Sequence, residues 1–175
     1  MSIAPALLSS QSNEWFTPAK YIAAARQVMG GAIELDPASC EEANLVVKAA
    51  RYYTQAEDGL SQPWHARSLW LNPPYGKTGK TSNQAFWTHK LIAEYRAGNV
   101  AEAILLVNAV TDCAWFAPLW EQFICFTNHR IKFYNSAGQP DSPTKGNAFV
   151  YFGPQSEIFR TAFSQFGAVV SRVQS

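Results

Sequence analysis

The segment of this sequence best suited to do chemistry is the tetrapeptide Asn72-Pro73-Pro74-Tyr75. Asn72 carries an amide oxygen and Pro73 a backbone carbonyl, and two such acceptors can hold the two N–H groups of an exocyclic amine. An amine of this kind is a poor nucleophile because its lone pair is delocalised into the ring or carbonyl to which it is attached. Hydrogen bonds that pull the nitrogen toward tetrahedral geometry aim the lone pair outward. The tetrapeptide therefore predicts catalysis by positioning, without a strong base.

The other residues of the tetrapeptide suit the same role. Proline fixes φ and pushes the residue before it to an extended conformation, so Pro73 and Pro74 predict a rigid turn that holds both acceptors. Tyr75 adds an aromatic face on which a planar base can stack, a contact worth about 1 to 3 kcal/mol. The four residues together predict a site for a flipped-out base. The alternative is a purely structural diproline turn with a packing tyrosine.

The elements around this motif alternate between strands and helices. Apolar and β-branched runs predict strands over 32–35, 51–54, 68–71, 102–108, 123–126, 131–134 and 147–152. Helix formers with matching ends predict helices over 19–29, 41–50, 84–97 and 112–120, with Thr17 and Asn83 as caps. Residues 55–59, 77–82 and 136–146 are expected to be loops. The pattern predicts an α/β fold with a mostly parallel sheet and an antiparallel edge. The tetrapeptide would lie at its carboxyl edge, where open α/β sheets bind ligands.

Length and composition limit the class of protein. A chain of 175 residues is the size of one domain, here expected over 13–175 after a flexible tail over 1–12. The balance of 14 Lys+Arg against 13 Asp+Glu argues against a protein whose whole surface must be covered by a polyanion. No apolar run is long enough to span a bilayer. The start of the chain lacks the basic region of a signal peptide, which predicts a cytoplasmic protein. Three cysteines without a C-x-x-C pair and three scattered histidines predict neither disulfides nor a metal site.

The tetrapeptide, together with Glu14-Trp15-Phe16-Thr17-Pro18 and Leu35-Asp36-Pro37-Ala38, resembles the phage DNA N6-adenine methyltransferase (Dam-like) family over roughly residues 13–153. The resemblance implies a reduced, Rossmann-like class I methyltransferase domain that uses S-adenosyl-L-methionine. It implies methyl transfer to N6 of an adenine flipped out of double-stranded DNA, by a monomer or weak dimer in the cytoplasm, or in the host cytoplasm for a phage-encoded protein.

The resemblance also assigns site residues. Asn72, Pro73, Pro74 and Tyr75 would be catalytic. Asp36, Pro37 and Ala38 would lie near the methionine part of the cofactor, with Trp15, Phe16, Thr17 and Pro18 covering that pocket and Asp58 and Gly59 near the cofactor adenine.

The chain departs from the family pattern after the first strand. Ser39-Cys40-Glu41-Glu42 stands where a glycine-rich loop is usual, and either Glu57 or Asp58 could bind the ribose. Simpler interpretations also stay open: Asp36 could end a strand, Asp58 could form an Asx turn, and Trp15 with Phe16 could form a hydrophobic staple.

The two parts of the sequence differ in charge. Residues 1–75 hold 7 acidic and 5 basic residues, a net −2, whereas residues 76–175 hold 9 basic and 6 acidic residues, a net +3. The basic candidates for contact with DNA phosphates are Lys77, Lys80, Arg130, Lys132 and Lys145, each of which could instead be a solvated surface charge. We expect modest, salt-sensitive DNA affinity and a short or relaxed recognition sequence.

Other functions fit the same motif. An N-P-P-Y site could methylate an RNA adenine or the side-chain amide of a protein glutamine, and cytosine N4 is less favoured because that class more often resembles S-P-P-Y. A different class of function is a catalytically silent DNA-binding domain.

Overall fold

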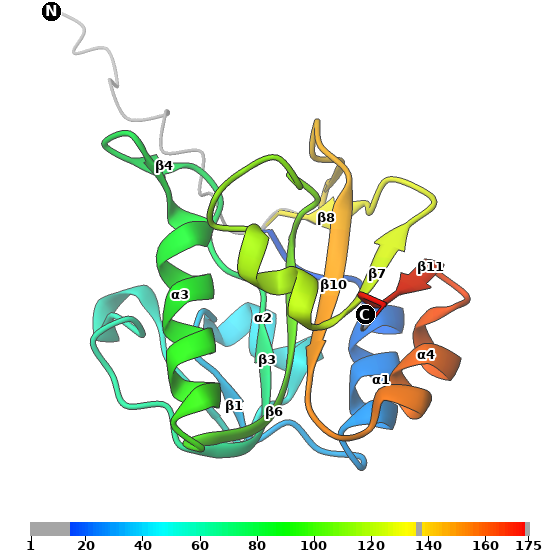
Figure 1. Cartoon of the computed structure of the whole chain (residues 1–175). Helices are drawn as coiled ribbons and strands as arrows, with labels where there is room; N and C mark the ends of the chain where they lie inside the picture. Colours follow the sequence, from blue (N-terminus) through cyan, green and yellow to red (C-terminus); the bar gives the residue numbers. More distant parts are fainter. Residues whose placement is uncertain (1–14, 136–137, 174–175) are drawn as a thin grey trace, which may run out of the picture.

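The structure is a computed structural model that describes residues 15–135 and 138–173. The tail expected over 1–12 lies outside the described residues. Figure 1 shows a central sheet seen nearly edge-on with helices on both faces.

Seven strands form the central sheet. Their spatial order is β11 (Gly167–Val170), β7 (Phe123–Thr127), β10 (Asn147–Phe152), β6 (Val100–Asn108), β3 (Ala66–Leu71), β1 (Leu35–Asp36) and β2 (Arg51–Tyr52). Strands β2, β1, β3 and β6 are parallel, and β10, β7 and β11 continue the sheet with antiparallel pairing. The predicted α/β fold with a parallel part and an antiparallel edge is confirmed, and the antiparallel part takes up three strands.

The helices cover the two faces of the sheet. One face carries α1 (Ala19–Val28), α2 (Glu41–Val47) and α4 (Ser156–Phe163), and the other carries α3 (Asn83–Arg96) and the 3₁₀ helix η2 (Ala117–Glu121). The central strand β6 serves both cores, because side chains alternate along a strand. Ile104 and Leu106 pack toward α1 and α4, while Ala103, Leu105 and Val107 pack toward α3.

The register of the parallel strands determines where their ends lie. Leu35 pairs with Leu69, and Leu69 pairs with Ala103, so β1, β3 and β6 run side by side in one direction. Their carboxyl ends meet at one edge, which brings together Asp36, the segment that starts at Asn72, and Asn108. Two small hairpins, β4 (Lys77–Thr78) with β5 (Thr81–Ser82) and β8 (Phe133–Tyr134) with β9 (Pro140–Asp141), lie at this same end of the molecule (Figure 1).

The helix predicted over 112–120 is wrong. Residues 111–116 form turns, and the only helical turn there is η2, with Pro118 near its start. Proline has no N–H to donate and its ring clashes with the preceding helical turn, so a helix through 112–120 would carry a breaker in its interior. The aromatic side chains of Trp115, Phe116 and Trp120 pack together there.

Both predicted caps are also wrong. The residues that precede α1 and α3 are Pro18 and Ser82, and neither Thr17 nor Asn83 caps a helix. Their side chains bond to the tetrapeptide instead, as described below. The predicted loop over 77–82 contains the β4–β5 hairpin, and α4 and β11 were not predicted. Among the described residues, no helix is both long and apolar enough to cross a bilayer.

Candidate active site

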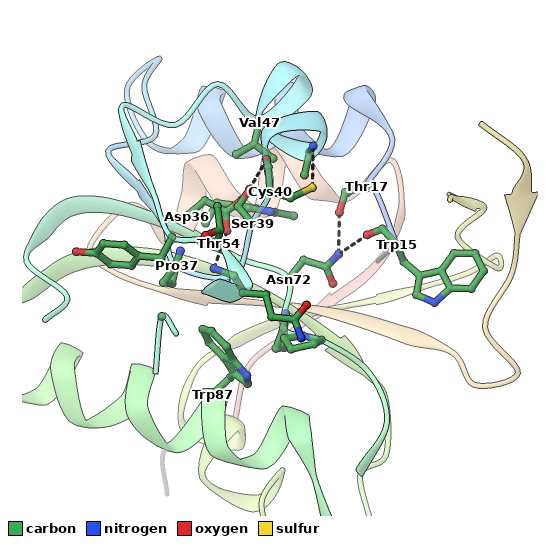
Figure 2. Close-up of a pocket in the computed structure, with 18 of the residues that line it drawn as sticks. Trp15, Thr17, Asp36, Pro37, Ser39, Cys40, Val47, Thr54, Asn72 and Trp87 are labelled. Carbon is green, nitrogen blue, oxygen red and sulfur yellow. Dashed lines mark hydrogen bonds between the residues drawn. The ribbon is translucent and has the colours of Figure 1, made fainter. Parts of the chain in front are cut away.

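Asn72 is the first residue after β3 and is held by its amide nitrogen. Its Nδ2 donates hydrogen bonds to the Trp15 carbonyl oxygen at 3.1 Å and to the Thr17 hydroxyl at 3.2 Å, as Figure 2 shows. Its Oδ1 is buried and has no hydrogen-bond partner among the described residues. An unpaired buried acceptor costs roughly 1 to 3 kcal/mol. The side chain is therefore fixed so that an acceptor is left over, ready for a donor from outside the chain.

The segment that holds Asn72 comes from before α1. Phe16 forms an isolated antiparallel bridge with Tyr134, with N···O distances of 2.8 and 3.1 Å. This bridge ties the segment to the β8–β9 hairpin. The hydroxyl of Thr17, predicted as a helix cap, is thus used to orient Asn72.

Tyr75 is held from three sides. Its ring lies edge-on to Phe133 with centroids 6.0 Å apart, and its hydroxyl accepts a hydrogen bond from Asn147 Nδ2 at 3.3 Å. Burial raises the pKa of the Tyr75 hydroxyl, which keeps it neutral. Asn83 Nδ2 donates to the Tyr75 carbonyl at 3.0 Å, and Asn83 Oδ1 accepts from Thr78. The amide of Asn83 therefore closes the turn that follows the tetrapeptide.

Asp36, the last residue of β1, is a buried carboxyl group with only 2% of its surface exposed. Its Oδ1 accepts a hydrogen bond from the Ala38 N–H at 3.3 Å. Burial raises its pKa to about 7, and hydrogen bonds from Ser39 and Ala38 offset part of that rise. No ion pair of the described residues includes Asp36. A cation that entered the site would favour the charged carboxylate.

The loop after β2 places Asp58 at the site and keeps Glu57 away from it. Glu57 accepts hydrogen bonds from the Thr54 N–H and hydroxyl at 2.8 and 2.9 Å, and these bonds lower its pKa. The Asp58 side chain is exposed, and its backbone adopts the left-handed conformation with φ of 50°. Gly59 allows this loop to pack closely against the backbone of Pro37, because a Cβ at this position would lie 1.9 Å from the Pro37 carbonyl oxygen.

These groups surround one pocket of about 660 Å³. Twelve of the predicted site residues line it: Trp15, Phe16, Thr17, Asp36, Pro37, Ala38, Asp58, Gly59, Asn72, Pro73, Pro74 and Tyr75. Pro18 does not line it and precedes α1 instead. In Figure 2, Trp87 of α3 lies on the opposite side of this pocket from Asp36 and Cys40.

Sequence reasoning missed several lining residues: Ser39, Cys40, Ala43, Val47, Tyr53, Thr54, Gln55, Trp70, Asn83 and Trp87. Trp87 fits the apolar face of α3, so its spacing marked it only as core. Its indole stacks on that of buried Trp64, with centroids 5.8 Å apart. Trp64 in turn donates to the Gly59 carbonyl at 2.7 Å. A tryptophan that serves both the core and a pocket wall has no local sequence signal.

A second pocket of about 220 Å³ adjoins the first and shares Trp15 and Tyr75 with it. Its other lining residues are Asn108, Phe133, Asp141, Ser142, Pro143, Thr144 and Lys145. Tyr75 therefore lines both pockets, whereas Asn72 lines only the larger one of the two.

The five basic residues predicted to contact DNA are all exposed. Lys145 lines the second pocket. Lys77 lies on β4 and Lys80 in the turn between β4 and β5, while Arg130 and Lys132 lie between β7 and β8. The structure thus brings Lys145 to a pocket and leaves the other four on neighbouring surface segments.

Known proteins are similar to this chain over most of its length. A model of the family described as DNA N-6-adenine-methyltransferase (Dam) matches residues 5–172. The DNA N-6-adenine-methyltransferase of Haemophilus phage HP1 (strain HP1c1) is 26% identical over 152 residues, which cover 84% of this chain and 82% of the phage protein. No solved structure gives a significant match. Because the family match extends over most of the chain, the resemblance found in the sequence is confirmed, and the chain belongs to the DNA N-6-adenine-methyltransferase (Dam) family.

Proposed function

We propose that this enzyme methylates N6 of an adenine flipped out of double-stranded DNA, and that Asn72 and Pro73 hold the amino group. The observation that carries the proposal is the buried Asn72 Oδ1, which has no hydrogen-bond partner in the described part of the chain, while Nδ2 donates two hydrogen bonds. An exocyclic amine supplies the missing donor. The Pro73 carbonyl, held by the diproline backbone, accepts the second N–H.

The larger pocket suits S-adenosyl-L-methionine as the methyl donor. Its volume of about 660 Å³ falls within the usual range of roughly 300 to 1,000 Å³ for small-molecule sites. The buried Asp36 carboxyl, which forms no ion pair with any described residue, suits a ligand that carries positive charge on an ammonium and a sulfonium. When bound, this cofactor supplies an electrophilic methyl group, and the net products are N6-methyladenine, S-adenosylhomocysteine and a proton.

Individual residues would hold different parts of the cofactor. Asp36 and the turn through Pro37 and Ala38 would lie near its methionine part, with Trp15 to Thr17 covering that region. Asp58 is the acid we assign to the adenosine part, since Glu57 is occupied by Thr54. Gly59 would act indirectly, by letting this loop pack against Pro37.

The smaller pocket suits the target base. Tyr75 borders both pockets, so a base stacked on its ring would place its amino group beside Asn72. Phe133 and Asn147 fix the ring, which reduces the entropy lost when the base binds. Catalysis then depends on positioning and on two preorganised acceptors.

Binding to duplex DNA would use the exposed basic residues around the site. Lys145 at the rim of the smaller pocket, Lys77 and Lys80 on one side and Arg130 and Lys132 on another would contact phosphates. Such contacts predict an affinity that falls steeply with salt. We further propose that methylation is specific for a short sequence.

The test uses labelled S-adenosyl-L-methionine with separate DNA, RNA and protein substrates. Wild-type protein should label N6 of DNA adenine, and Asn72→Ala should lose at least about 100-fold in turnover while it still binds the cofactor in calorimetry. Asn99→Ala, at the opposite edge of the sheet, is the matched control. Label in RNA or protein alone, or full turnover by Asn72→Ala, would refute the proposal.

A further inference from the structure

Two asparagines face each other at the end of the β6–β10 pair, beside the smaller pocket. Asn108 is the last residue of β6 and pairs in register with Asn147, the first residue of β10. Both side-chain oxygens are buried and lack a hydrogen-bond partner among the described residues. Asparagine is a poor strand residue, so two of them opposite each other need a reason.

The two side chains differ in what they contact. Asn147 is 1% exposed and donates through Nδ2 to the Tyr75 hydroxyl, so it positions the aromatic ring. Asn108 lines the smaller pocket, and within residues 15–135 and 138–173 its side chain makes no hydrogen bond. Its backbone N–H donates to Gln84 Oε1 at 3.1 Å, which anchors the main chain and leaves the carboxamide to other partners.

The burial of the two Asn108 side-chain atoms indicates which one reaches the pocket. Oδ1 is fully buried, whereas Nδ2 is not among the buried unpaired atoms and has no protein partner in the described part of the chain. The amide nitrogen is therefore the polar atom that Asn108 presents to a ligand. A donor in this position selects for an acceptor.

The proposed function restricts what that acceptor can be. If Asn72 and Pro73 take both N–H groups of the target amine, the rest of the adenine edge offers only acceptors, and N1 and N7 are the ring nitrogens nearest the amine. Guanine presents an N1–H donor where adenine has an acceptor. A donor opposite N1 would therefore accept adenine and reject guanine.

We propose that Asn108 contacts the target base by donating a hydrogen bond from Nδ2 to one ring nitrogen of the adenine, N1 or N7; this rests on the proposed function. Donation to N1 would in addition reject guanine, because N7 is an acceptor in both purines. Asn108 thus reads the ring, Asn72 holds the amine, and Asn147 acts indirectly through Tyr75. All three are amides at the carboxyl edge of the sheet, and the buried oxygen of each has no hydrogen-bond partner within residues 15–135 and 138–173.

The test is a cycle that combines a protein variant with altered bases. Methylation kinetics are measured for wild type and Asn108→Leu on one oligonucleotide whose target is adenine, 1-deazaadenine or 7-deazaadenine. On adenine, Asn108→Leu should lower kcat/KM about tenfold. On the analogue that lacks the contacted nitrogen, wild type and variant should be equally active, because the hydrogen bond is already gone.

Controls separate this inference from folding and from the proposed function. Asn108→Asp keeps the size of the side chain but removes the amide donor. It replaces Asn108→Leu in the test if that variant does not fold, and the same pattern of activities is expected. Asn99→Leu is the matched control, and thermal unfolding and cofactor calorimetry monitor integrity. An active wild type with an equal loss on all three bases, or no loss, would overturn the role of Asn108 alone. A wild type that does not methylate DNA adenine would overturn the proposed function and the role of Asn108 with it.

Discussion

Replacement of Asp36 by asparagine should stabilise the protein, and increasingly so as pH rises. Burial raises the pKa of this carboxyl from 3.8 to about 7 in the folded protein. A difference of about 3 in pKa is equivalent to about 4 kcal/mol. Asparagine has nearly the same shape and keeps an oxygen for the Ala38 N–H, but it has no charge to bury.

The sign follows from proton binding. Between pH 3.8 and about 7 the folded state keeps a proton that the unfolded state has released, so the wild-type free energy of unfolding falls as pH rises. The slope is about 1.4 kcal/mol per pH unit, and it ends above the folded pKa. Asp36→Asn lacks this loss. Its advantage over wild type should therefore grow by about 2.5 kcal/mol between about pH 5 and pH 8.

Urea unfolding of both proteins at about pH 5, 6, 7 and 8 measures this difference. Asp112→Asn, which removes an exposed carboxylate, controls for the loss of one negative charge. The same protonation should weaken cofactor binding to wild type as pH falls below about 7, because a cation favours the ionised carboxylate. A stability difference between wild type and Asp36→Asn that does not change with pH would refute the reasoning.

Two further substitutions test how the pocket is built. Gly59→Ala should lower the melting temperature and weaken cofactor binding, because its Cβ would lie 1.9 Å from the Pro37 carbonyl oxygen; thermal unfolding and calorimetry measure both, and a variant with unchanged affinity would contradict it. Thr17→Val removes one of the two acceptors of Asn72 Nδ2, so kcat should fall about tenfold with KM for DNA unchanged in steady-state kinetics. Equal kcat in Thr17→Val and wild type would show that Trp15 alone orients Asn72.

The sequence predicts those strands whose apolar pattern and flanking residues match their position in the folded sheet. Within the predicted strand 102–108, residues 103–107 are apolar throughout, and β6 is the strand shared by both cores. The run 68–71 ends at two prolines that cannot continue a sheet, and β3 ends there at Leu71. For the same reason the position of Asn72 at the sheet edge could be predicted from the sequence.

The side-chain partners at the site could not be predicted, because they depend on contacts between residues far apart in the sequence. Thr17 and Asn83 have the residue types and positions of helix caps, and such residues form caps only when no other partner competes. Here Asn72 lies 55 positions after Thr17 and takes its hydroxyl, and Asn83 bonds to Tyr75. Asn108 and Asn147 stand at ordinary strand ends, and only the β6–β10 register brings them together.

The central claim is that this chain methylates N6 of DNA adenine through an amine held by Asn72. Its most direct test expresses wild type and Asn72→Ala in a host without adenine methylation and maps modified bases in plasmid DNA by sequencing. Wild type should give N6-methyladenine at one short sequence, and Asn72→Ala should give none while it accumulates to the same level. Unmodified plasmid from wild type, or equal methylation from both proteins, would contradict the claim.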